Sequence, residues 1–256
     1  MTDIRLVYGI IESPSAALAR QAASPAETGG LGPMSARILH GTPAFRLNSP
    51  GWANAAPDVI QTVSGTEALV DYCRTRLLGR VSIFSLVLRS FIAAYIDFAV
   101  AEVERRREEL DARLREAGLS GEDGLATYRE WVFSVLLPLP QCHIAVPPPH
   151  DPADQVSVDV LFWTGRRALA LTMAGRTMPT PCRRRALESL ASAHPALKLA
   201  SMNVPDDGRS WVFDEDFLEL LGEDFLPGTG LPFGPYRVLV AEPSGGEAGD
   251  GSQARQ

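Results

Sequence analysis

The sequence lacks an excess of basic residues, because its 24 Lys and Arg are outnumbered by 31 Asp and Glu and the formal net charge is −7. Proteins that bind nucleic acid over their whole surface rely on a surplus of Lys and Arg. The charge balance therefore disfavours sequence-independent binding of nucleic acid and leaves only a local basic groove open to it.

Cysteine is also scarce. Cys73, Cys142 and Cys182 are scattered and form no CxxC spacing. Three thiols cannot all pair within one chain, and the paired-ligand spacing of a structural zinc site is missing. Free thiols are typical of a reducing compartment. Because no secretory signal pattern is apparent either, we expect a cytoplasmic protein.

The sequence lacks an uncharged apolar run of the kind that spans a membrane. The stretch that comes nearest to one, residues 81–101, contains Arg89 and Asp97. One charge near the centre of a membrane helix costs about 2.5–3.5 kcal/mol. We therefore predict no contact with a membrane and instead a long soluble helix over residues 81–117, with Gly118 ending it.

The 22 Gly and 20 Pro predict long irregular stretches and suggest a division of the chain. Residues 1–60 are rich in Ala, Gly, Pro and Ser, and we expect an irregular N-terminal arm with short strands over residues 4–10 and 36–47. Residues 61–242 would form one folded domain that includes the long helix. Residues 243–256 lack apolar anchors and are expected to be a disordered tail.

The second half of the chain alternates between strand and helix patterns, after a helix at residues 64–78 and an ambiguous stretch at 125–137. This order favours an α/β (α+β) fold with a mixed sheet flanked by helices. We predict strands over residues 142–146, 156–163, 167–173, 197–204 and 236–241, and helices over residues 180–192 and 214–221.

One acidic residue stands in the middle of an apolar strand, Val158-Asp159-Val160-Leu161-Phe162-Trp163. Burying a carboxylate is costly unless it is paired or binds a metal. Two explanations of Asp159 stay open: it faces solvent on the polar side of the sheet, or it is a metal ligand or the remnant of one.

The hairpin over residues 158–175, with its turn Thr164-Gly165-Arg166, resembles the core hairpin of the PD-(D/E)XK nuclease superfamily, in particular its restriction-endonuclease-like members. The resemblance covers roughly residues 130–205. In that family an Asp on the first strand and an acidic-X-Lys on the second hold Mg²⁺ and position the attacking water. The resemblance implies a restriction-endonuclease-like sheet with Asp159 in the position of a metal ligand.

The chain departs from the family pattern at the other two positions, where Thr172 and Ala174 replace the second acid and the Lys. Hydrolysis with Mg²⁺ needs hard oxygen ligands and a group that prepares the water. We therefore predict a pseudo-nuclease, a catalytically inactive PD-(D/E)XK-like domain that serves as a structural or protein-interaction module. It would have a protein partner and need no cofactor.

An active Mg²⁺-dependent nuclease is the alternative, with the second carboxylate relocated to the following helix. The candidate catalytic residues are then Asp159, Glu188 and Arg184, with Arg183, Asp154, Glu102 and Glu104 as further candidates. A surface ion pair of Glu188 with Arg184 or Arg185 explains the same residues more simply. A third hypothesis is an unrelated α/β scaffold whose hairpin resembles the family by chance.

Overall fold

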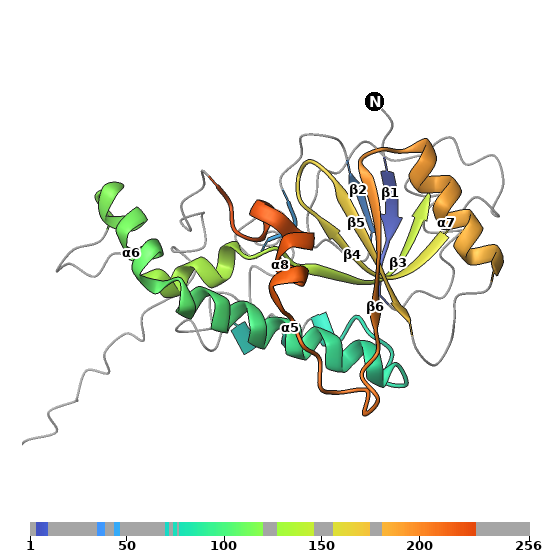
Figure 1. Cartoon of the computed structure of the whole chain (residues 1–256), viewed down its shortest axis with the longest axis horizontal. Helices are drawn as coiled ribbons and strands as arrows, with labels where there is room; N and C mark the ends of the chain where they lie inside the picture. The colour runs from blue at the N-terminus through green and yellow to red at the C-terminus, as the bar shows by residue number, and fades with distance from the viewer. Residues whose placement is uncertain are drawn as a thin grey trace, which may run out of the picture.

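The computed structural model describes residues 4–9, 35–38, 44–46, 70–71, 74–75, 77–119, 127–145, 156–174 and 181–228. These residues form a mixed α+β structure around a six-stranded sheet of order β2-β1-β3-β4-β5-β6 (Figure 1). Only β5 and β6 are parallel, and the other neighbouring pairs are antiparallel. The strands are β1 (Ile4–Val7), β2 (Ser35–Ile38), β3 (Pro138–Ala145), β4 (Val156–Trp163), β5 (Ala168–Ala174) and β6 (Leu197–Asn203).

The β4–β5 hairpin forms where the sequence predicts it. Its turn is closed by the N–H of Thr164, which donates to the carbonyl of Arg167 at 3.0 Å. The Thr164 hydroxyl also accepts from the N–H of Arg167 at 3.2 Å. Gly165 has φ +90°, a backbone conformation that favours glycine. The sequence of the turn thus fixes the hairpin locally.

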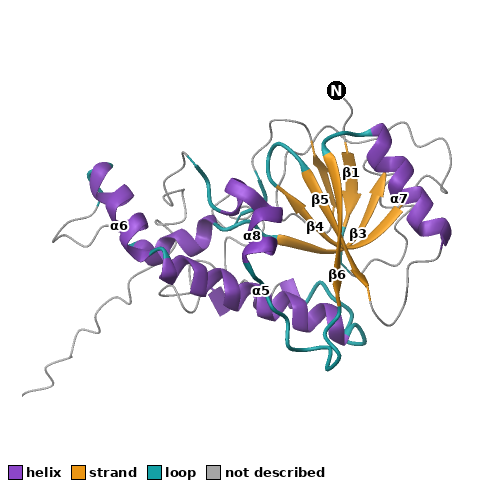
Figure 2. Ribbon diagram, in the orientation of Figure 1, coloured by secondary structure: helices purple, strands orange, loops and turns teal. Residues whose placement is uncertain are grey.

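Helices cover both faces of the sheet (Figure 2). The parallel pair β5–β6 requires a crossover connection, and α7 (Pro181–Ala193) provides it. On the other face, Tyr95 of α5 (Leu86–Arg105) packs against Phe162 of β4 with ring centroids 5.3 Å apart. Because side chains alternate along β4, Asp159 lies on the opposite face, under α7.

The long helix predicted over residues 81–117 is shorter and broken. It begins at Leu86, is interrupted at Arg106, and continues as α6 (Arg107–Glu116), which extends away from the sheet (Figure 1). At the break, the buried carboxylate of Glu102 accepts hydrogen bonds from Arg105 and Arg106, each as short as 2.6 Å. Burial works to raise the pKa of Glu102, but the hydrogen bonds and the positive charges of Arg105 and Arg106 together outweigh it and hold that pKa below its usual value.

The two charges in the apolar part of this helix have partners inside the protein. The Arg89 guanidinium donates to the carbonyls of Leu78 at 2.7 Å and Val81 at 3.2 Å. Asp97 forms an ion pair with Arg74. Within the part of the chain that the structure describes, no helix has the length and apolarity needed to span a bilayer.

A cluster of aromatic rings joins α5 to α8 (Glu215–Leu221) and the segment before it. Phe91 contacts Trp211 edge-on at 5.1 Å and Phe213 at 5.5 Å, and Phe213 contacts Phe217 at 4.8 Å. Asp214 caps α8 by accepting from the N–H of Phe217 at 3.1 Å. This cluster attaches the residues that follow β6 to the face of the sheet that α5 covers.

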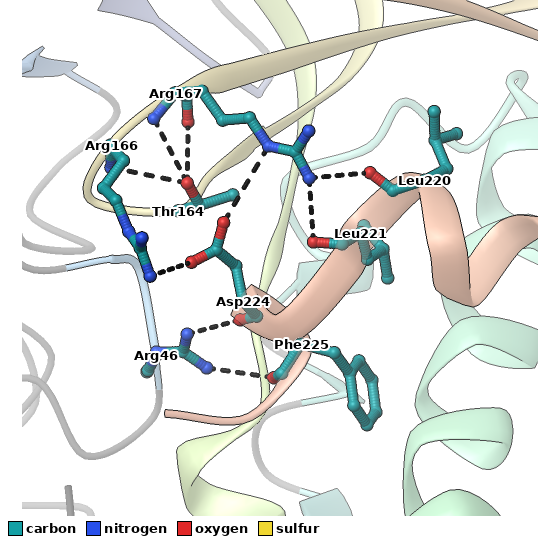
Figure 3. Close-up of polar contacts among 8 residues, drawn as sticks. All are labelled: Arg46, Thr164, Arg166, Arg167, Leu220, Leu221, Asp224 and Phe225. Carbon is teal, nitrogen blue, oxygen red and sulfur yellow. Dashed lines mark hydrogen bonds and ion pairs between the residues drawn. The ribbon is translucent and has the colours of Figure 1, made fainter. Parts of the chain in front are cut away.

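A buried arginine ties the N-terminal part of the chain to the end of this region (Figure 3). The guanidinium of Arg46, which is 9% exposed, donates to the carbonyls of Ser134, Asp224 and Phe225. These carbonyls lie in the 3₁₀ helices η1 (Tyr128–Ser134) and η3 (Gly222–Phe225). The Asp224 carboxylate in turn pairs with Arg166 at 3.5 Å in the hairpin turn.

The predicted division at residue 60 needs correction, because the described residues of the expected irregular arm belong to the sheet. β1 lies between β2 and β3, and Ile4 and Leu6 are buried there. The described residues of the patch expected over residues 36–47 have other partners: β2 pairs with β1, and Arg46 forms a bridge with Leu136.

The stretch over residues 125–137, for which the sequence favours neither helix nor strand, contains η1. The helix predicted over residues 64–78 is helical at residues 70–71, 74–75 and 77–78. The strand expected over residues 236–241 and the tail over residues 243–256 lie outside the described residues.

Candidate functional site

Asp159 occupies a point where β4 is no longer paired through its backbone with β5. The pairing of β4 with β5 runs from Trp163 with Ala168 to Val160 with Leu171. One residue further, the Asp159 carboxylate accepts a hydrogen bond from the N–H of Met173 at 2.8 Å. The side chain thus replaces the backbone acceptor where the two strands separate.

The other neighbouring strand is also irregular at this level. In β3, Pro140 pairs with Val160 and Cys142 with Val158, which leaves Gln141 opposite Asp159. Gln141 has φ +49°, which is uncommon for a residue other than glycine. Its side-chain oxygen accepts from the N–H of Ser82 at 3.3 Å. The backbone around Asp159 is therefore shaped by side-chain hydrogen bonds on both flanks.

Arg183 of α7 supplies the positive charge beside Asp159. One guanidinium nitrogen lies 3.6 Å from the carboxylate, and the Nε donates to the carbonyl of Ser157 at 2.9 Å. Both side chains are about one-third exposed, at 32% for Asp159 and 30% for Arg183. The carboxylate that the sequence leaves unexplained is thus paired with a cation of the same chain.

His143 lies next to this ion pair. It pairs with Ser157 across β3 and β4 and is half-buried. Burial lowers its pKa, and the positive charge of Arg183 lowers it further. His143 is consequently neutral at neutral pH.

Exchanging Arg183 for Gln should raise the pKa of His143 toward its ordinary value near 6.5, because one of the two causes of the shift is removed. Burial persists, so the pKa stays below that of a free imidazole. NMR titration of the His Cε1–H resonances measures this shift, with His194 as the internal control. An unchanged His143 pKa would show that Arg183 does not act on it.

The same shift has a consequence for stability. The pKa of His143 is lower in the folded than in the unfolded chain, so the unfolded chain takes up the proton first as the pH falls below about 6.5. His143 therefore destabilises the fold in that range and has no effect above it.

Thr172 and Ala174, the two positions at which the sequence departs from the family pattern, lie close to Asp159. Both belong to β5 and flank Met173, which donates to the carboxylate. The Thr172 hydroxyl donates to the carbonyl of Ala200 in β6 at 3.3 Å, and Ala174 offers no polar side-chain group. These positions add no anionic ligand to Asp159.

The other candidate residues are engaged elsewhere. Glu188 and Arg184 form an exposed i, i+4 pair at 2.9 Å on α7. Glu102 is held at the helix break, and Glu104 accepts from the hydroxyl of Tyr128 at 2.6 Å. Asp154 lies outside the described residues. Among the residues that the structure describes, no three His, Cys, Asp or Glu side chains come close enough together to hold a metal ion.

The pairing of Arg183 with Asp159 was the main feature that sequence reasoning missed, although a signal for it exists. Arg183, Leu187 and Leu190 follow helical i, i+4, i+7 spacing, and Leu187 is buried. This spacing places Arg183 on the side of α7 that faces the sheet. Arg184 and Arg185 are exposed and do not share that face.

Comparisons with family models, with curated proteins and with solved structures found no match. What the fold establishes is the class, a mixed α+β protein whose sheet carries one half-buried Asp–Arg pair under a crossover helix.

Proposed function

We propose that this chain is a catalytically inactive, nuclease-like domain that acts as a structural or protein-interaction module. The observation that carries the proposal is the state of Asp159, whose carboxylate is bound by the Met173 N–H and by Arg183. The resemblance to the PD-(D/E)XK superfamily implies that this residue lies on a central strand of a mixed sheet with helices on both sides. The position of β4 agrees with that expectation.

The chemistry of the neighbouring groups supports inactivity. Magnesium prefers several hard oxygen ligands, usually carboxylates together with water. Beside Asp159 the chain offers the hydroxyl of Thr172 and the methyl group of Ala174, and a metal ion would have to compete with the guanidinium of Arg183. Asp159 is thus suited to joining β4, β5 and α7 and poorly suited to holding a cation.

Other features agree with a module that needs no cofactor. Cys142 is buried, and burial raises the pKa of its thiol, which makes it a poor nucleophile at neutral pH. A cytoplasmic location and a protein partner, both expected from the sequence, belong to the same proposal.

The test is a cleavage assay with the purified full chain on supercoiled plasmid DNA and on single-stranded RNA, with millimolar Mg²⁺ or Mn²⁺. We expect no cleavage above background from the wild type or from Asp159→Asn, which preserves an acceptor for Met173. Metal-dependent cleavage that Asp159→Asn abolishes would overturn the proposal. Calorimetric Mg²⁺ binding that Glu188→Gln removes would establish the relocated site instead.

A further inference from the structure

The start of α5 exposes a cluster of large apolar side chains. Ile83, Phe84 and Leu86 are 68%, 88% and 70% exposed, and Val212, in the segment between β6 and α8, is 73% exposed. A single exposed apolar residue is ordinary, but three within four consecutive positions form a patch that needs an explanation.

A groove begins at this patch. It has a volume of about 500 Å³ and lies between the first turns of α5 and the loop that follows β6. We call it the α5 groove. Its apolar lining is formed by Leu86, Val87, Ala93, Ala94, Val204 and Pro205.

The far wall of the α5 groove is held in place by hydrogen bonds. The hydroxyl of Ser90 donates to the carbonyl of Gly208 at 2.7 Å and accepts from the indole N–H of Trp211, also at 2.7 Å. Asp207 accepts from the N–H groups of Arg209 at 2.8 Å and Ser210 at 2.9 Å. A groove fixed in this way loses little conformational entropy when a ligand binds.

The groove is also acidic. Asp206 and Asp207 line it beside Arg209, and Asp97, a third acidic lining residue, is already paired with Arg74. Hydrogen bonds from the side chain and the N–H of Ser210 lower the pKa of Asp207 to about 2, so it is charged at neutral pH. Such a surface repels phosphate and anionic lipid headgroups and attracts cationic partners.

We propose that the α5 groove binds a basic amphipathic segment of another protein, with large apolar side chains in the groove and Lys or Arg facing its carboxylates. The inference rests on the proposed function as an interaction module and adds the surface and the chemistry of its partner. The apolar patch beside the groove supplies contact area, and the acidic rim selects the sign of the partner's charge.

The test starts from a random peptide library displayed on phage and selected on the immobilised full chain, with counter-selection on Phe84→Ser. We expect the enriched peptides to combine at least two large apolar residues with a net positive charge. The strongest of them is then synthesised with a fluorescent label, and its affinity is measured by anisotropy.

Three variants of the full chain then separate the contributions. Phe84→Ser should weaken binding of the labelled peptide about tenfold or more, as truncation of a central apolar contact does. Asp206→Lys should weaken it several-fold and reduce its dependence on salt. Glu108→Lys makes the same charge change on an exposed residue of α6, outside the groove, and should leave binding unchanged.

Several results would overturn the inference. These are enrichment of acidic or uncharged peptides, equal losses in Asp206→Lys and Glu108→Lys, binding to anionic vesicles that Phe84→Ser abolishes, or a dimer in light scattering that the same substitution dissociates. The cleavage assay is independent of all of them. A failure of peptide binding therefore leaves catalytic inactivity standing, and nuclease activity would not alter the peptide result.

Discussion

Replacing Arg46 by Met should lower the free energy of unfolding by about 3–5 kcal/mol, the range observed when one partner of a buried charged network is removed. The methionine keeps most of the apolar volume of the side chain. It cannot donate to the carbonyls of Ser134 and Asp224, which lose the guanidinium as donor, or to that of Phe225, which keeps the N–H of Leu136 at 3.0 Å. Each buried acceptor that is left without a donor lowers the free energy of unfolding by about 1–3 kcal/mol. Urea unfolding followed by circular dichroism measures the loss.

Arg166→Met is the matched control, because Arg166 also pairs with Asp224, at 3.5 Å, but is 77% exposed. Solvent-exposed ion pairs contribute about 0–1 kcal/mol. We therefore expect the control to change stability by less than about 1 kcal/mol. Equal losses in the two variants would show that the effect comes from the charge near Asp224 and not from the buried carbonyls.

Phe91→Ala should lower the free energy of unfolding by a similar amount, about 3–5 kcal/mol, as is typical when a buried phenyl ring is truncated. Phe91 is fully buried at 0% exposure, and its ring contacts Tyr95, Trp211 and Phe213. The substitution removes one of the α5 rings, beside Tyr95 and Phe98, that contact the segment after β6. Thermal and urea unfolding of the full chain measure the loss.

Phe84→Ala removes the same group seven positions earlier, where the side chain is 88% exposed. Surface substitutions of this kind change stability by about 0.5 kcal/mol or less. A small effect of Phe84→Ala beside a large effect of Phe91→Ala confirms that the exposed ring is not part of the core. A loss above about 2 kcal/mol at Phe84 would instead assign it a structural role.

The elements with local signals were predicted well from the sequence. The crossover helix was expected over residues 180–192 and spans Pro181–Ala193, and the strand expected over residues 156–163 matches β4 (Val156–Trp163). Three local signals are sufficient to predict these elements: alternating apolar residues in the strand, the Thr164-Gly165 turn and a proline at the start of the helix. They are sufficient because the partners of these segments are close in the chain.

Pairings between strands that are distant in the sequence could not be predicted. A strand was expected over residues 4–10 and β1 (Ile4–Val7) forms there, but its partner β3 lies far along the chain, and nothing in either strand specifies the other. Arg46 raises the same difficulty, because its burial depends on carbonyls in η1 and η3. Composition alone made these segments resemble an irregular arm.

The candidate site was predicted in part. An Asp in an apolar strand is conspicuous in the sequence, but its hydrogen-bond donor is the backbone of Met173, which has no sequence signature. The identity of the cation followed from the helical spacing of Arg183 only once α7 was placed against β4.

The parallel pair β5–β6 bears on the order in which the chain acquires its structure. β3, β4 and β5 are consecutive antiparallel strands, so their contacts join residues that are close in sequence and form early. β6 can align with β5 only after α7 has closed the longer loop between them. Because Arg183 attaches α7 to β4, we expect this contact to guide the late closure, so that Asp159 contributes to the rate of folding as well as to the finished sheet.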